Sequence, residues 1–130
     1  MSKNLLDTNL IIRFLVNDDS KKVSRVEKLL KDKGNQNILL DTILAEIVWV
    51  LNSYYSLNKL DIIEKLRALI HVETVECNAF LLGRALSLWE ENNISYIDGY
   101  LAAVAELGNI PLLTFDQKFN SITTIKVTKP

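Results

Sequence analysis

Asn4-Leu5-Leu6-Asp7-Thr8-Asn9 is the stretch of this chain that most directly indicates its fold. The residues before Asp7 read as a short buried strand, and the residues after it begin a helix that continues through Phe14 and Leu15. Asp7 therefore stands at the carboxyl end of a strand and at the start of a helix. A strand that leads directly into a helix is the beginning of an α/β unit.

Strand and helix patterns continue to alternate along the rest of the chain. A helix with apolar residues at 23, 26, 29 and 30 ends at Gly34, and further helices are predicted over residues 42–55, 61–70, 79–91 and 96–107. Strands are predicted over residues 37–40, 71–75, 110–114 and 124–127, with a single turn at 116–119. This alternation predicts an α/β fold with a central, mostly parallel sheet of four to five strands flanked by helices.

Length and composition indicate one globular domain over residues 1–130. Hydrophobic residues make up 48% of the 130 residues and charged residues 24%, which is the balance of a domain with a sizeable core. The formal net charge is −1, so the chain is not a general polycation binder, and contact with nucleic acid must come from local patches.

The cysteine content and the lengths of the apolar segments indicate the cellular compartment of the protein. Cys77 is the single cysteine, which rules out an intramolecular disulfide and favours a reducing environment. The start of the chain lacks the pattern of a signal peptide, and no apolar run is long enough to span a bilayer. We therefore expect a cytoplasmic protein that is not inserted in a membrane.

Glu46 is the acidic residue with the least favourable surroundings in the sequence. It is the only polar residue between Ile43 and Leu51. A helix that is apolar nearly all round is buried, and a buried carboxylate needs a compensating partner. Alternatively, Glu46 reaches solvent from the first turns of its helix, helped by the positive end of the helix dipole. The sequence leaves both interpretations open.

Three further acids are placed where strands end or helices begin. Asp7 follows the first predicted strand, Asp116 follows a strand that includes Thr114 and Phe115, and Asp98 stands three residues after Ser95 at the start of a helix. Each of them alone is explained as a helix cap or as part of a capping box. Together they point to one chemistry, because parallel sheets bind ligands at the carboxyl ends of their strands.

Four carboxylates at one site repel one another and favour a bound cation. Oxygen ligands without histidine or cysteine suit a hard ion such as Mg²⁺ or Mn²⁺. Such an ion lowers the pKa of a bound water and offsets charge on a phosphoryl group. Asp7, Glu46, Asp98 and Asp116 therefore support metal-assisted hydrolysis of phosphodiester bonds.

The order of these motifs resembles that of a known family. Leu5-Leu6-Asp7-Thr8-Asn9, Glu46 on an apolar helix, Asp98 followed by Gly-Tyr-Leu-Ala-Ala, and Thr114-Phe115-Asp116 resemble the PIN-domain nucleases. Within that family, the chain is most similar to the VapC-type toxins of bacterial type II toxin–antitoxin pairs. The resemblance extends from Asp7 to Phe119 and leaves no motif position unmatched.

The resemblance implies a PIN-like fold, endoribonuclease activity, a cognate antitoxin, a homodimer and a Mg²⁺ or Mn²⁺ cofactor. It assigns the catalytic and metal-binding roles to the four acids. It also implies that three neighbouring polar residues orient carboxylates or water: Thr8, Asn9 and Thr114. Two cations near these motifs are candidates for RNA contact, Arg13 one helical turn beyond Asn9 and Lys118 two residues beyond Asp116.

Two other functions compete with the nuclease. In a Mg²⁺-dependent phosphotransfer domain Asp7 would be the nucleophile, but such enzymes usually carry a second acid two residues later, where this chain has Asn9. In a non-catalytic PIN-like binding module the carboxylates would only hold an ion or contact a partner. The presence of all four acids argues against a degenerate site, although an intact site does not prove turnover.

Overall fold

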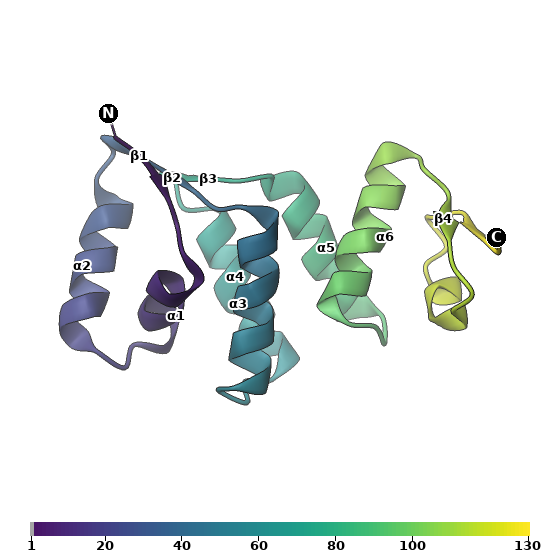
Figure 1. The fold of residues 1–130 in the computed structure, drawn as a ribbon, viewed down its shortest axis with the longest axis horizontal. Helices are drawn as coiled ribbons and strands as arrows, with labels where there is room; N and C mark the ends of the chain where they lie inside the picture. Colours follow the sequence, from purple (N-terminus) through teal and green to yellow (C-terminus); the bar gives the residue numbers. More distant parts are fainter. Residues whose placement is uncertain (1) are drawn as a thin grey trace. The chain divides into compact units, whose positions relative to one another are not determined.

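A computed structural model describes residues 2–130 of the chain, which divide into two compact units, residues 2–79 and residues 80–130. The first unit contains β1 (Ser2–Leu5), α1 (Thr8–Val16), α2 (Ser20–Lys31), β2 (Asn35–Ile38), α3 (Asp41–Ser53), α4 (Lys59–Ile70) and β3 (Val75–Glu76) (Figure 1). The remaining elements are α5 (Ala79–Glu91), α6 (Tyr96–Gly108), β4 (Leu112–Leu113), the 3₁₀ helix η1 (Gln117–Ser121) and β5 (Val127–Thr128). In residues 2–130, no helix is long and apolar enough to cross a membrane.

The sheet of the first unit is parallel and has the strand order β1-β2-β3. Leu5 pairs with Ile38, and Ile38 pairs with Glu76, so the carboxyl ends of the strands meet at one edge. Parallel neighbours require crossover connections, which α1 and α2 provide between β1 and β2, and α3 and α4 between β2 and β3. The sheet therefore places the residues that follow β1 and β2 at a common edge.

The predicted central sheet of four to five strands is wrong in its strand number. The main sheet has three strands, while β4 and β5 pair in parallel with each other in a separate two-stranded sheet of the second unit. The sequence pattern indicates which segments are extended, but it does not specify their partners. The α/β character and the parallel pairing are confirmed.

The strand expected over residues 71–75 is shorter and begins later than predicted. His71 is the C-cap of α4, and the backbone N–H of Val75 donates to the carbonyl of Val72 at 2.9 Å, which forms a turn. Only Val75–Glu76 extends alongside β2. Residues 71–74, which were predicted as part of a strand, therefore form the cap of α4 and the turn after it.

A buried polar network joins the sheet of the first unit to α2. Asn37 is fully buried, its Oδ1 accepts from Asn4 Nδ2 at 3.0 Å, and its Nδ2 donates to Thr74 Oγ1 at 3.1 Å. Thr74 Oγ1 in turn donates to the Leu30 carbonyl at 2.6 Å. A buried amide must have its hydrogen bonds satisfied, so this network favours one register of β2 against its neighbours.

Two helices of the second unit pack closely at Gly99. A Cβ atom added at this buried glycine would lie 2.8 Å from the Ala85 carbonyl oxygen and 3.1 Å from the Trp89 backbone nitrogen. Near the same contact, the rings of Trp89 and Tyr96 meet edge to face with centroids 5.8 Å apart. The glycine that follows Asp98 in the sequence is therefore required by the close approach of α5 and α6.

Candidate active site

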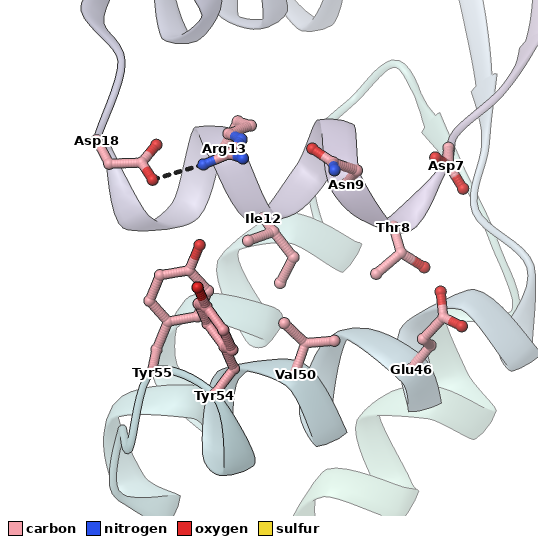
Figure 2. Close-up of a pocket in the computed structure, with 10 residues that line it drawn as sticks. All are labelled: Asp7, Thr8, Asn9, Ile12, Arg13, Asp18, Glu46, Val50, Tyr54 and Tyr55. Carbon is pink, nitrogen blue, oxygen red and sulfur yellow. Dashed lines mark hydrogen bonds and ion pairs between the residues drawn. The ribbon is translucent and has the colours of Figure 1, made fainter.

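A cavity of about 540 Å³ in the first unit contains two of the predicted acids, Asp7 and Glu46. Figure 2 shows these acids together with Thr8 at one end of the cavity, and Tyr54, Tyr55, Arg13 and Asp18 at the other end. Its remaining lining residues are Asn9, Ile12 and Val50. The cavity thus has an acidic end, an apolar middle and an aromatic end that carries an ion pair.

Asp7 is held at the carboxyl end of β1 by the backbone. The N–H of Leu6 donates to the carbonyl of Ile38 at 3.0 Å, which continues the pairing of β1 with β2 up to the residue before Asp7. Asp7 then occupies the N-cap position of α1, yet among the described residues its side chain makes no capping hydrogen bond. Its exposed carboxylate is therefore not used for capping, although the sequence alone favoured that explanation.

Glu46 is exposed, which decides between the two interpretations that the sequence left open. The helix α3 buries Leu44, Ile47, Val48 and Leu51, whereas its other face carries Glu46 and Trp49, and Trp49 is 66% exposed. The apolar run around Glu46 includes residues that stay at the surface, so the helix is not buried all round. The Glu46 carboxylate lines the cavity without a desolvation cost that would require a partner.

Thr8 and Asn9 line the same cavity, as their place in the motif predicts. Thr8 is 7% exposed, and its Oγ1 has no hydrogen-bond partner among the residues described. Buried hydroxyls in folded proteins usually have a hydrogen-bond partner, so the Thr8 hydroxyl is able to bind a water or a ligand oxygen in this cavity. Figure 2 shows this hydroxyl beside the carboxylates of Asp7 and Glu46.

Arg13 also lines the cavity, where it forms an ion pair that the sequence analysis missed. Its Nη1 lies 2.7 Å from Oδ2 of Asp18. The pair forms because Asn17 ends α1 in the left-handed conformation, with φ of 53°, and turns the chain back. An asparagine directly after the last apolar position of a helix is the signal that could have indicated this turn.

The tyrosines at the far end of the cavity close the C-terminal end of α3. The rings of Tyr54 and Tyr55 meet edge to face with centroids 4.9 Å apart, and Tyr54 is 78% exposed. No motif in the sequence placed them near the acids. Tyr54 is the C-cap of α3 and Tyr55 follows it, so the end of the helix brings both rings to the cavity, and helical periodicity from Glu46 does not predict their position.

The other two predicted acids, Asp98 and Asp116, lie together in the second unit and share one lysine. Lys118 Nζ lies 3.1 Å from Asp98 Oδ2 and 3.3 Å from Asp116 Oδ2. Asp98 also completes the predicted capping box, because its Oδ2 accepts from the N–H of Ser95 at 3.1 Å. Asp98 therefore both caps α6 and contacts the lysine that it shares with Asp116.

Hydrogen bonds hold the pKa values of both aspartates below their usual range. Burial of Asp98 acts to raise its pKa, but the Ser95 N–H, the Lys118 ammonium and the Ser95 hydroxyl together lower it. The pKa of Asp116 is lowered chiefly by the backbone N–H of Lys118. The contacts with Asp98 and Asp116 in turn raise the pKa of Lys118. At neutral pH the group consists of two carboxylates and one ammonium ion.

Thr114 fixes the backbone at Asp116. Its Oγ1 accepts from the N–H of Asp116 at 3.0 Å, and Oδ1 of Asp116 accepts from the N–H of Lys118 at 3.0 Å. These two bonds hold the start of η1 in place. The contact supports the predicted orienting role of Thr114, which stays a prediction.

The donor chemistry of the acids fits a hard divalent ion. All four are carboxylates, the Asp98–Asp116 pair already shares a cation, and the unpartnered Thr8 hydroxyl lies beside Asp7 and Glu46. Within each described unit, however, no three acidic, histidine or cysteine side chains form a group that could hold a metal ion. Two of the four predicted acids lie in each unit.

Comparison with solved structures finds chains of similar length and low identity. A VapBC2 complex from Rickettsia felis, bound to a DNA fragment from its promoter, is 21% identical, with 99% of this chain and 98% of that chain covered and a TM-score of 0.42. A toxin–antitoxin complex from Klebsiella pneumoniae is 20% identical, with coverages of 98% and 97% and a TM-score of 0.37. The Mycobacterium tuberculosis toxin VapC20, described as cleaving the sarcin-ricin loop, is 19% identical, with coverages of 98% and 99% and a TM-score of 0.42.

The family assignment depends on the sequence and not on these likenesses. No curated protein matches the chain. A family model of the PIN domain matches residues 5–124, a range that contains every predicted site residue. Because this match covers nearly the whole length, the chain belongs to the PIN domain family.

Proposed function

We propose that this protein is a divalent-metal-dependent endoribonuclease and the toxin of a type II toxin–antitoxin pair. The observation that carries the proposal is the PIN domain match over residues 5–124, a range that contains Asp7, Glu46, Asp98 and Asp116. The geometry adds independent support, because the Asp7 side chain makes no capping bond and the Glu46 carboxylate faces the same cavity.

The four carboxylates are the proposed catalytic and metal-binding residues, two from each unit. When bound, Mg²⁺ or Mn²⁺ would lower the pKa of a water molecule and offset charge on the phosphoryl group. Thr114 holds the backbone of Asp116, while Thr8 and Asn9 present a hydroxyl and an amide beside Asp7 that can orient a carboxylate or a water. The chain's own contribution is the placement of these oxygen atoms.

RNA contact is proposed for Arg13 and Lys118. Arg13 lines the cavity that contains Asp7 and Glu46, and its pairing with Asp18 leaves the side chain 35% exposed. A guanidinium there can bind a phosphate of the RNA backbone while Asp18 keeps it in position. Lys118 can reach a phosphate only by leaving Asp98 and Asp116. These contacts stay predictions.

A cognate antitoxin, a homodimer and a cytoplasmic location complete the proposal. An antitoxin that inhibits the site would place a basic side chain among the carboxylates, where charge complementarity is greatest. Co-expression with the product of the neighbouring gene should then abolish cleavage by the purified complex. Unchanged cleavage after complex formation would contradict this mode of inhibition.

The first test is cleavage of a panel of structured and single-stranded RNAs in Mg²⁺, Mn²⁺ or EDTA by the wild type and by Asp7→Asn. We expect metal-dependent cleavage that falls by at least the roughly 10- to 100-fold loss typical of groups that merely orient metal ligands. Asp7→Asn is the cleanest variant, because the Asp7 side chain makes no capping bond and its loss should leave the fold intact.

Asp19→Asn is a matched control for this experiment. Asp19 is the N-cap of α2 in the same unit and accepts from the backbone N–H groups of Lys21 and Lys22. Asparagine caps helices as well as aspartate does, so this variant removes one negative charge without removing the cap. Wild-type cleavage by Asp19→Asn and loss in Asp7→Asn would support the proposal, whereas equal cleavage by all three proteins would contradict it.

A further inference from the structure

Lys118 is held between Asp98 and Asp116 by contacts at both of its ends. Its ammonium lies 3.1 Å from one carboxylate and 3.3 Å from the other, while its backbone N–H donates to Asp116 Oδ1 at 3.0 Å. The Lys118 side chain is 39% exposed, and those of Asp98 and Asp116 are 16% and 50% exposed. One lysine thus contacts two of the proposed metal ligands and offsets one of their two negative charges.

The surrounding structure keeps this arrangement in place. Asp98 is positioned by the capping box with Ser95, and Asp116 by the hydroxyl of Thr114. The 3₁₀ helix that carries Lys118 is anchored by Phe119, which is 3% exposed. Each of the three charged residues therefore has an anchor besides its contacts with the other two: Ser95 for Asp98, Thr114 for Asp116, and the buried Phe119 beside Lys118.

Two neighbouring carboxylates repel each other unless a cation lies between them. A divalent ion that takes Oδ2 of Asp98 and Asp116 must bind the same atoms that Lys118 Nζ contacts. We propose that Lys118 is a resident counter-ion, which holds this pair of carboxylates together before a metal ion binds and competes with that ion for their oxygens. The inference rests on the proposed metal site and makes Lys118 a positioning residue.

The test is a calorimetric titration of the metal-free full chain with Mn²⁺ alone. Lys118→Met keeps most of the side-chain volume and removes the competing ammonium, so we expect Mn²⁺ to bind about tenfold more tightly, which corresponds to ~1.4 kcal/mol. Lys118→Arg restores a cation and should return the affinity to near the wild-type value. An affinity of Lys118→Met equal to or below that of the wild type would overturn the inference.

Lys126→Met is the matched control, because it removes the same charge from another lysine of the second unit. A general effect of net charge would tighten Mn²⁺ binding equally in both methionine variants and would overturn the inference. Asp98→Asn separates this inference from the proposed function. If Asp98→Asn leaves Mn²⁺ affinity unchanged, the proposed metal site is itself wrong. If Asp98→Asn weakens binding but Lys118→Met behaves like Lys126→Met, only the role of Lys118 is wrong.

A second readout follows the wild-type protein itself and needs one variant only to assign a resonance. The side-chain ¹⁵Nζ resonance of Lys118, assigned by its absence from Lys118→Arg, should shift during titration with Mg²⁺ as the ammonium leaves the carboxylates. The Lys126 resonance should stay in place. A Lys118 resonance that does not move while Mg²⁺ binds would show that the ion and the lysine do not compete.

Discussion

At Arg84 the guanidinium forms two hydrogen bonds with one carboxylate, that of Glu106. Nε donates to Oε2 at 2.6 Å and Nη2 to Oε1 at 2.8 Å, and the two side chains are 30% and 17% exposed. The bond from Arg84 is the largest cause of a lowered Glu106 pKa, opposed by burial and assisted by a hydrogen bond from Thr124. This geometry is the strong, bidentate form of an ion pair.

The Arg84–Glu106 pair should make stability depend on pH. Because the folded-state pKa of Glu106 is lowered, its contribution is fully present above its unfolded-state value of about 4.3 and is lost as pH falls through the folded value. We expect Glu106→Gln to lower the free energy of unfolding by about 1–2 kcal/mol at pH 7. The difference from the wild type should shrink between about pH 5 and pH 3.

Urea unfolding at each pH measures this difference, with Glu73→Gln as the control. Glu73 pairs with Lys33 at 3.7 Å, and both side chains are more than three quarters exposed. An exposed pair of this kind contributes between zero and about 1 kcal/mol, so this variant should stay close to the wild type throughout. A Glu106→Gln deficit that is the same at pH 7 and pH 3 would refute the assigned contribution.

At the residue scale, the sequence predicted the four site acids and the local capping box of Asp98, but not the contacts of Lys118 with Asp98 and Asp116. Asp7 and Asp116 could be placed because each directly follows a predicted strand, a relation that local order determines. The contact of Lys118 with Asp98 joins residues twenty positions apart and depends on how η1 packs against the start of α6. Side-chain contacts over such a separation follow from tertiary packing, which local patterns do not contain.

Among the elements, α5 and α6 depend most strongly on a single residue. Gly99→Ala would place a methyl group 2.8 Å from the Ala85 carbonyl oxygen and 3.1 Å from the Trp89 nitrogen, both of which are backbone atoms. Backbone cannot move aside as a side chain can, so the helices must separate. The gain in helix propensity of about 1 kcal/mol offsets part of the overpacking, and we expect a net loss of about 1–2 kcal/mol in thermal unfolding.

Gly108→Ala tests the same substitution where the neighbour is flexible. There the added Cβ would lie 2.9 Å from Cδ1 at the far end of the Ile110 side chain, and Ile110 is 55% exposed. The isoleucine can rotate away, and the new alanine favours the last turn of α6. Gly108→Ala should therefore be neutral or slightly stabilising, and equal losses at both glycines would contradict the close approach at Gly99.

Helices were predicted well at the element scale, and short strands were not. The prediction for residues 79–91 coincides with α5, and that for 96–107 ends one residue before α6 does. A helix of twelve or more residues repeats its apolar pattern several times. By contrast, β3, β4 and β5 have two residues each, too few for any period, and their partners are decided by the rest of the fold.

For the molecule as a whole, the sequence predicts one domain over residues 1–130, whereas the structure has two compact units. One domain requires that the two units unfold in a single transition. We propose that they unfold together, because the PIN domain match runs through both and because a unit of about fifty residues is marginally stable by itself. The chain has two tryptophans, Trp49 in α3 of the first unit and Trp89 in α5 of the second.

Two single-tryptophan variants can report on the units separately. Trp89→Phe leaves Trp49 as the fluorescent probe of the first unit, and Trp49→Phe leaves Trp89 as the probe of the second. We expect each fluorescence transition in urea to coincide with the far-ultraviolet circular dichroism transition of the same variant, as one cooperative domain requires. Fluorescence and dichroism midpoints that differ within a variant would instead identify two independently unfolding units.

The order of the two units along the chain affects what the protein can do while it is being synthesised. Synthesis runs from the N-terminus, so Asp7 and Glu46 leave the ribosome before the acids of the second unit do. Asp98 and Asp116 come from roughly the last quarter of the chain. Under the proposed function, a nascent chain that has not yet been synthesised as far as Asp98 lacks two of its four acids and is not expected to cleave RNA.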